Sequence, residues 1–522
     1  MKNIKKLREN LVFRFNGRKL NKLKRTLFRF FKWTRNFVIQ LTIVLLLLIG
    51  IVNVLIRIQR TANHKIPLIG NFIEQLNDVN EVTLFRNIEA LGIIVGLIAF
   101  ALNAPNRQKR SHYEAWQAIN SAEGKSGSGG RIQALEDLAR DGVSLAGLSA
   151  SKAYLRDIAL RGADLVKANL KESDLKNSDF QGADLSKADL RGADLREANF
   201  IKANLSEADF SKINVDGSNN GIKTNLRGVN LSRAKLIKAK LVEASLFEAK
   251  LVGADLSNAI LTGSDLSRAN LSSATLKGAN FKGVKIDSNT NLSDKWHLVW
   301  RIVNKGACSQ DLSGADLSDT NLIGADLSRA NLSHAKFNGT NLFKANLNSA
   351  NLSDTKIIEA KLNNVNLNGA NLSDAELYNT ELIGADLSGS DLSRANLIEA
   401  NLIEANLSRA ILIGTKLNKV KLIKAKFNKA NLSGAKLTEA DLSGAKLIEA
   451  DLKSANLTHA KLTEADFSNA NLSGVDLSKA NLRGAKNLAI DQIKLAKDWK
   501  EAEYDENFRT LLGLPPKEKR KI

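Results

Sequence analysis

The stretch DLSGADLSDTNLIGADLSRANLSHAKFNGT, residues 311–340, repeats one pattern every five residues. Its central position holds Leu at 312, 317, 322, 327 and 332 and Phe at 337. From 312 to 482 this position is Leu, Phe or Ile in thirty-five successive units, and the residue two places earlier is Ala in twenty-five of them. A period of five matches neither a helix nor a strand, so the stretch predicts an array of stacked copies of one unit.

A second period of twenty residues is superimposed on the first. The residue after the central Leu is Ser at 313, 333, 353, 373 and 393, whereas another family in phase contains Ser328, Asn348, Asn368, Ser388 and Ser408. Sidedness that returns every twenty residues indicates four units per coil, which predicts a four-faced β-solenoid. Each buried Leu contributes roughly 1.5–3 kcal/mol, so dozens in register can offset the ordering entropy of the chain.

The unit Ala-Asp/Asn-Leu-x-x, as in residues 325–329, resembles the repeat of the pentapeptide-repeat family. The resemblance covers residues 143–486, about two thirds of the chain. It implies a right-handed quadrilateral β-helix in which the small residue and the central Leu point inward, and it implies no shared activity. The expected fold class is therefore an all-β repeat, a pentapeptide-repeat solenoid with N-terminal transmembrane helices and short capping helices.

Two interruptions divide the repeat, at residues 216–224 and 287–310. The first contains Asp-Gly-Ser-Asn-Asn-Gly, which is typical of a loop at a corner. In the second, Trp296, Val299, Trp300 and Val303 recur on one face of a short amphipathic helix. Trp296 and Trp300 are a candidate site for a partner at this insertion helix. The alternative is that they pack the helix against the solenoid wall.

Helical caps are expected at both ends, because open ends of a solenoid expose unpaired backbone. Residues 107–142 form a predicted helical linker and N-terminal cap, which includes a helix opened by the capping box Ser111 to Glu114. Residues 487–522 form the predicted C-terminal cap. Ile493, Ala496, Trp499 and Ala502 indicate one helix there, and a second is expected from Asp505 to Gly513.

The first hundred residues predict a membrane anchor. Residues 37–56 are uncharged and mostly apolar, and residues 1–36 before them hold thirteen Lys/Arg against one acid. A second span is expected at about 88–104, so that residues 37–106 form a transmembrane hairpin. The basic flanks predict that segment 1–36 and the solenoid are both cytoplasmic, in a multi-pass protein with the lipid bilayer as a partner.

Charge and composition exclude several functions. The net charge of +21 is concentrated in residues 1–36, and residues 143–486 carry 45 Lys/Arg against 38 Asp/Glu. Membrane topology accounts for the basic segment, so no nucleic-acid partner is expected. Cys308 is the single cysteine, and the five histidines show no ligand spacing. The sequence contains no catalytic constellation, so we expect no enzyme, no metal and no cofactor.

Two stripes of apolar residues occupy positions that are otherwise polar. One stripe contains Ile323, Phe343, Ile383, Ile403 and Ile423, and the neighbouring stripe contains Ile358, Tyr378 and Ile398. Contiguous outward apolar residues indicate a contact with a protein partner or a homo-oligomer. The alternative is that stacked β-branched residues merely shield the backbone ladder.

These features favour a membrane-anchored, non-enzymatic scaffold or protein-interaction solenoid with an unidentified protein partner. The alternative function is a topoisomerase inhibitor, because some members of the family mimic DNA and occupy the DNA site of gyrase. Such mimicry requires a strongly acidic surface. Here Lys repeatedly precedes the central residue, as at Lys336, Lys356 and Lys361, which weighs against that alternative.

Overall fold

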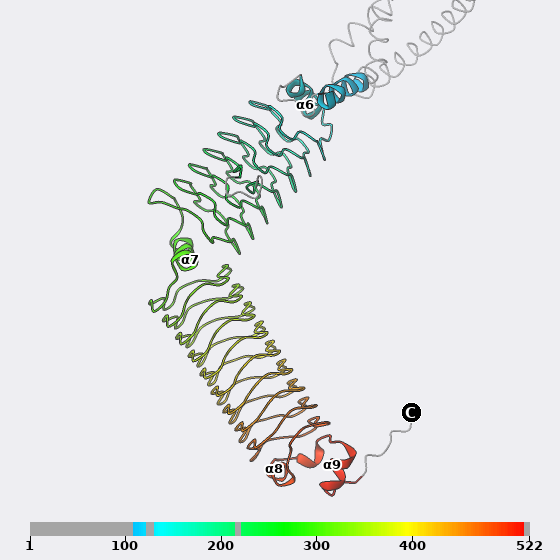
Figure 1. Cartoon of the computed structure of the whole chain (residues 1–522), viewed down its shortest axis with the longest axis vertical. Helices are drawn as coiled ribbons and strands as arrows, with labels where there is room; N and C mark the ends of the chain where they lie inside the picture. Colours follow the sequence, from blue (N-terminus) through cyan, green and yellow to red (C-terminus); the bar gives the residue numbers. More distant parts are fainter. Residues whose placement is uncertain (1–107, 122–129, 214–220, 516–522) are drawn as a thin grey trace, which may run out of the picture. The chain divides into compact units, whose positions relative to one another are not determined.

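The computed structural model describes residues 108–121, 130–213 and 221–515 (Figure 1). The chain divides into two compact units, Met1–His112 and Tyr113–Ile522, and the second contains the solenoid. Its elements in chain order are α6 (Arg131–Arg140), a first solenoid, α7 (Asp294–Lys305), a second solenoid, α8 (Ile490–Lys494), the 3₁₀ helix η1 (Trp499–Glu501) and α9 (Glu506–Leu511).

Each coil of the second solenoid contains twenty residues and four faces. Residues twenty apart pair as parallel bridges, as in Asp311 with Asn331 and Asn331 with Asn351. Four such columns run along the solenoid, and we name the faces that carry them face 1 (from Asp311), face 2 (from Asp316), face 3 (from Asn321) and face 4 (from Asp326). The N–H of His334 donates to the carbonyl of Ser353 over 3.0 Å, which places Ser333 and Ser353 on one face. The predicted four-faced coil is confirmed.

A β-turn forms each corner of the coil. In the unit centred on Leu327, the N–H of Ala330 donates to the Leu327 carbonyl over 3.2 Å, and Arg329 has φ of 55°. A positive φ at the third turn position is the geometry of a type II turn, which favours Gly. Other units place Gly at this position, as at Gly389 with φ of 67°. The corners therefore favour Gly, and other residues such as Arg329 occupy them in a left-handed backbone conformation.

The interior of the coil is filled by the two inward positions of each unit. Leu327 and Ala330 are both fully buried. Phe rings stack where they follow one another in successive coils, as in Phe180 and Phe200 with centroids 4.9 Å apart. Where Thr replaces Ala, its hydroxyl bonds to the backbone, as in Thr340 Oγ1 to the Leu317 carbonyl at 2.6 Å. At this Thr the buried hydroxyl at the small position is therefore satisfied by the backbone.

The first interruption is an insertion between two coils. Asp209 pairs with Lys240, thirty-one residues later instead of twenty, so the ladder resumes after an excursion of the chain. An antiparallel bridge between Ile213 and Ile222 closes the base of this excursion. The loop expected there is consistent with this closure, although residues 214–220 lie outside the described part of the chain.

Helical caps cover both ends of the repeat, with two corrections. Residues 108–110 are already helical, so the predicted helix start at Ser111 is wrong. The single helix expected from Ile493 to Ala502 is also wrong, because Lys497 and Glu503 instead pair with the last coil at Asp476 and Asn481. The backbone ladder thus continues into the cap and interrupts the helix. The second C-terminal helix is confirmed as α9, which Gly513 terminates with φ of 72°.

The predicted membrane topology is corrected. Across residues 108–121, 130–213 and 221–515, no helix is both long and apolar enough to cross a bilayer. The helical stretch at 108–121 and the twelve residues of α7 are among the helices of this part of the chain. The localisation as a multi-pass membrane protein with a cytoplasmic solenoid is therefore not retained. The basic segment 1–36 and the expected spans at 37–56 and 88–104 lie outside the described residues.

Candidate interaction surfaces

Face 3 of the second solenoid carries the longer apolar stripe. Within each unit the central Leu points inward, so the residues before and after it point outward on the same side, as in a strand. Ile323 and Ile383 are 40% and 38% exposed, and the other members of the stripe are half-buried, namely Phe343, Ile403 and Ile423. Asn363 interrupts the stripe, so its unbroken part runs from Ile383 to Ile423.

The second apolar stripe lies at the end of face 2, next to face 3 along the chain. Tyr378 is 37% exposed, while Ile358 and Ile398 are half-buried. The Tyr378 hydroxyl donates to Glu399 Oε2 over 2.9 Å, and this hydrogen bond raises the pKa of Tyr378 above its ordinary value. The two stripes therefore lie on adjacent faces, face 2 and face 3, in the same coils.

The backbone beneath the longer stripe is already hydrogen-bonded. The N–H of Gly384 donates to the carbonyl of Ile403 over 2.9 Å, and the N–H of Ile383 donates to Asn363 Oδ1 over 2.9 Å. On face 1, which carries Ser in place of Ile, equivalent backbone bonds form, as between Gly314 and Ser333 at 2.8 Å. Apolar side chains are therefore unnecessary for closing the ladder.

Face 1 contains a ladder of hydrogen-bonded Asn side chains that was not predicted from the sequence. Asn351 Nδ2 donates to Asn331 Oδ1 over 3.1 Å, and Asn371 Nδ2 donates to Asn351 Oδ1 over 3.1 Å. The signal was present in the sequence, since Asn recurs at intervals of twenty residues in this column. These amides are partners of one another within the coil, which makes face 1 a structural surface.

Helix α7 contributes side chains to the cores of both solenoids. Val299 and Ile302 are fully buried in the core of the second solenoid, and Trp296 and Trp300 pack against the core of the first. Trp300 Nε1 donates to the Val284 carbonyl over 2.7 Å, and the Trp296 ring stacks on Phe281 with centroids 5.9 Å apart. Trp296 and Trp300 thus pack against the solenoid wall, and each retains some exposed surface.

Asn304 is a further α7 residue that the sequence reading missed. Its Nδ2 donates to the carbonyls of Phe281 and Trp300 over 3.0 and 2.9 Å, and its Oδ1 accepts from Gly283 over 2.6 Å. Asn304 therefore caps backbone groups at the end of the first solenoid. A lone Asn carries no periodic signal that would have predicted this role.

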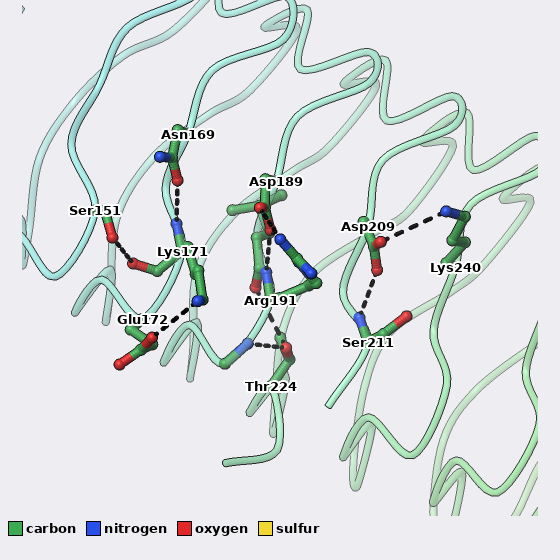
Figure 2. A network of polar contacts seen from close by, with 12 residues as sticks. Ser151, Asn169, Lys171, Glu172, Asp189, Arg191, Asp209, Ser211, Thr224 and Lys240 are labelled. Atoms are coloured by element: carbon green, nitrogen blue, oxygen red, sulfur yellow. Dashed lines mark hydrogen bonds and ion pairs between the residues drawn. The ribbon is translucent and has the colours of Figure 1, made fainter. Parts of the chain in front are cut away.

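The first solenoid carries a dense set of charged side chains that pair with one another (Figure 2). Arg191 contacts Asp189 over 2.6 Å, and Lys240 lies 3.6 Å from Asp209. Burial alone would raise the pKa of Asp189, but the hydrogen bonds from Arg191 outweigh it, and the pKa is held below its ordinary value. Inside the coil, Thr224 Oγ1 accepts from the Gly192 N–H over 2.8 Å. The contacts of Lys240 with Asp209 and of Thr224 with Gly192 join successive coils, whereas Arg191 and Asp189 pair within one coil.

The histidines of the described residues and Cys308 converge on no common site. His334 and His459 occupy left-handed turn positions, with φ of 59° and 58°. Cys308 is exposed, and hydrogen bonds from Ser328 and Ser309 lower the pKa of its thiol. In the described part of the chain, no three His, Cys, Asp or Glu side chains converge as metal ligands.

Lysines stack on lysines along faces 2 and 4 of the second solenoid. Lys336 pairs with Lys356 and Lys416 pairs with Lys436 on face 2, and Lys426 pairs with Lys446 on face 4. All six are exposed. Like charges on adjacent strands repel, and they make these faces locally basic.

Stacked five-residue units, four to a coil, with paired parallel strands and a Leu-filled interior, define a quadrilateral β-helix protein. A family model described as pentapeptide repeats (8 copies) matches stretches that together cover residues 141–219, 222–286, 311–348, 350–389 and 390–486, more than half of the chain. The chain belongs to the pentapeptide-repeat family, whose members fold as right-handed β-helix solenoids.

Several solved structures are similar to this chain. HetL, a pentapeptide-repeat protein involved in heterocyst differentiation regulation from the cyanobacterium Nostoc sp. strain PCC 7120, is 29% identical, with 57% of this chain and 89% of HetL covered and a TM-score of 0.12. Full-length QnrB1, a plasmid-mediated fluoroquinolone resistance protein, is 16% identical, with 55% and 95% covered and a TM-score of 0.16. No curated protein matches the chain.

Proposed function

We propose that this chain is a non-enzymatic protein-interaction scaffold, in which the second solenoid presents face 3 to a protein. The observation that carries the proposal is the unbroken column Ile383, Ile403 and Ile423, which points outward from a backbone that is already hydrogen-bonded. Apolar columns on an exposed surface are typical of a contact site, because monomeric proteins rarely leave contiguous apolar patches open to water.

The coil supplies the rigidity that such a scaffold requires. Successive isoleucines are held at the spacing of adjacent strands, about 4.8 Å, by a ladder of backbone hydrogen bonds. A surface that is ordered before binding loses little conformational entropy when a partner docks. The proposed role of the repeat is therefore to fix the positions of side chains on its faces.

The paired charges of the first solenoid support a structural role for that part of the chain. Arg196 and Lys176 both contact Asp194, over 2.7 and 3.0 Å, so these groups serve the cohesion of the coils. DNA mimicry has weaker support, because the repeat has a positive net charge and stacks lysines on faces 2 and 4.

The test is replacement of Ile383, Ile403 and Ile423 with Ser in the full chain. Ser already occupies the equivalent positions on face 1, so the coil is expected to accept it with little change in thermal stability. We expect the triple variant to lose the protein or oligomer that the unmodified chain forms, measured by tagged co-purification and sedimentation from the same cells.

The matched control replaces Ile413 and Ile448 with Ser. These two outward isoleucines lie on faces 1 and 4, outside the stripe, and Ile413 is 45% exposed. The control is expected to keep every association of the unmodified chain. Loss of association in both variants, or in neither, would contradict the proposal. A fall in thermal stability with unchanged association would assign the stripe a structural role.

A further inference from the structure

Face 3 carries a charge pattern that is complementary to itself when reversed. Its outward column reads Lys361, Glu381, Asn401, Lys421 and Asp441, and each residue is bridged to the next on the adjacent strand. About Asn401, the order of charges is positive, negative, neutral, positive, negative. Reversal about that centre brings Lys361 opposite Asp441 and Glu381 opposite Lys421, so that every charge meets its opposite.

The apolar column on the same face has the same centre. Ile403 follows Asn401 by two residues, and reversal about it places Ile383 opposite Ile423 and Ile403 opposite itself. The flanking polar residues match as well, since Asn363 comes opposite Ser443. Charge and hydrophobicity thus share one centre of symmetry.

We infer that face 3 binds face 3 of a second copy of this chain, with the two solenoids antiparallel about a two-fold axis through Asn401. This inference rests on the proposed function and names the protein that face 3 contacts. A two-fold axis that lies in the contact plane, perpendicular to the solenoid, reverses the order of the coils. It also keeps each column opposite its own copy. The result is an isologous interface, in which one patch is used by both subunits.

The charged groups of the pattern differ in availability, because Asp441 already forms an ion pair with Lys461 of its own chain over 3.8 Å. Lys361, Glu381 and Lys421 are exposed, and Asp441 is half-buried. Within its own chain, Glu381 accepts from Asn363 over 2.9 Å, and Asp441 accepts from Ser443 over 2.6 Å. The pair Glu381 with Lys421 of the second copy therefore contributes most of the electrostatic attraction.

The corner beside face 3 sets a limit on affinity. Glu404 follows Ile403 and comes opposite its own copy across the axis, where like charges repel. Lys424 lies one coil away in the same column, so each Glu404 also faces a lysine of the second copy on the diagonal. Both residues are exposed, so solvent screens the repulsion between the two Glu404 residues and the attraction of each to Lys424.

Faces 2 and 4 lack this combination. On face 2, reversal about Asn396 brings Lys356 opposite Lys436, which is repulsive. On face 4, reversal about Asn406 brings Asp386 opposite Lys426, but the residues beside that column are Ser388, Ser408 and Asn428. Face 3 alone among these three joins complementary charges to a central apolar column.

The test is a charge swap, read by sedimentation velocity of the full chain over a range of concentrations. Glu381→Lys places two lysines opposite each other at two symmetric points, and we expect the dimer dissociation constant to rise about tenfold. The double variant Glu381→Lys, Lys421→Glu exchanges the charges, and we expect it to restore dimerisation. Glu376→Lys is the matched control, at the same repeat position on face 2, and it should leave the dimer unchanged.

Cross-linking in a Cys308→Ser background tests the position of the axis. Ile403→Cys should be joined to its own copy by a short bismaleimide, whereas Ile423→Cys should cross-link efficiently only when mixed with Ile383→Cys. A chain that is monomeric at all concentrations, or a swap that fails to restore the dimer, overturns the inference. Weakening by Asp386→Lys instead of Glu381→Lys overturns it in favour of face 4. If the chain is monomeric while co-purification still depends on Ile383, Ile403 and Ile423, the dimer fails and the proposed scaffold function stands.

Discussion

Trp300 donates a hydrogen bond from its indole nitrogen to the carbonyl oxygen of Val284 over 2.7 Å, and this contact ties α7 to the end of the first solenoid. On the same helix, Val299 and Ile302 are buried in the core of the second solenoid. This twelve-residue helix thus covers the end of the first solenoid and contributes to the core of the second. Without such a cover, the last coil of the first solenoid would expose backbone groups and apolar side chains.

Substitution of Trp300 should loosen the end of the first solenoid. Trp300→Phe removes the hydrogen bond and leaves the Val284 carbonyl without this donor, which we expect to cost about 1–2 kcal/mol of local stability. Hydrogen exchange measured by mass spectrometry should show faster exchange in residues 271–286, with residues 400–480 unchanged. His297→Ala, on the same helix, is the control. Equal effects of the two variants would show that the indole contact has no special role.

The turn position filled by Gly389 should discriminate among side chains by backbone strain alone. Its φ is 67°, and a Cβ added there would meet no atom within 4 Å. Gly389→Val should therefore destabilise the solenoid by about 1–2 kcal/mol, since a β-branched residue is strained in the left-handed region, whereas Gly389→Asn should cost less. Denaturant midpoints of the two variants provide the measurement. Equal denaturant midpoints for the Val and Asn variants would show that the left-handed backbone at this corner does not determine which residue is favoured there.

Most of the coil could be predicted from the sequence because one residue choice is repeated many times. Leu327, Ala330 and their equivalents occupy the same buried positions in every unit. The five-residue period and the twenty-residue recurrence of the outward residues together predict a twenty-residue coil. The caps were predicted less well, since the strand pairing of Lys497 and Glu503 is a tertiary contact that overrides a helical pattern. The capping role of Asn304 could not be predicted, because this residue is not part of a periodic pattern. For the same reason, the apolar stripes could be located from sequence, while the exposed fraction of Ile383 required the structure.

Acid should destabilise the first solenoid. Burial by itself raises the pKa of Asp194. Hydrogen bonds from Arg196 and Lys176 lower that pKa by more than burial raises it, so the folded-state pKa lies below the ordinary value. A carboxyl with a depressed folded-state pKa contributes stability that is present above its unfolded pKa of about 4 and is lost as pH falls through the folded value. The pKa values of Asp184 and Asp189 are lowered as well.

The expected result is a melting temperature that is nearly constant from about pH 5 to 8 and decreases below about pH 4. Asp194→Asn removes one of the titrating groups, so this variant should be less stable at neutral pH and should show a shallower decrease in acid. A variant with the same slope as the unmodified chain would show that Asp194 does not contribute to the pH dependence.

Hydroxyl-radical footprinting tests the central claim, that face 3 is a protein-contact surface, most directly. The full chain is labelled in native lysate and again after purification and dilution, and oxidation is compared at Tyr378, Ile383 and Ile413. All three side chains are more than a third exposed in the isolated chain. Ile383 lies on face 3 and Tyr378 lies at the end of face 2, next to face 3, whereas Ile413 lies on face 1. We predict that Tyr378 and Ile383 are protected several-fold in lysate while Ile413 is labelled equally in both samples. Equal labelling of all three residues in both samples would contradict the claim.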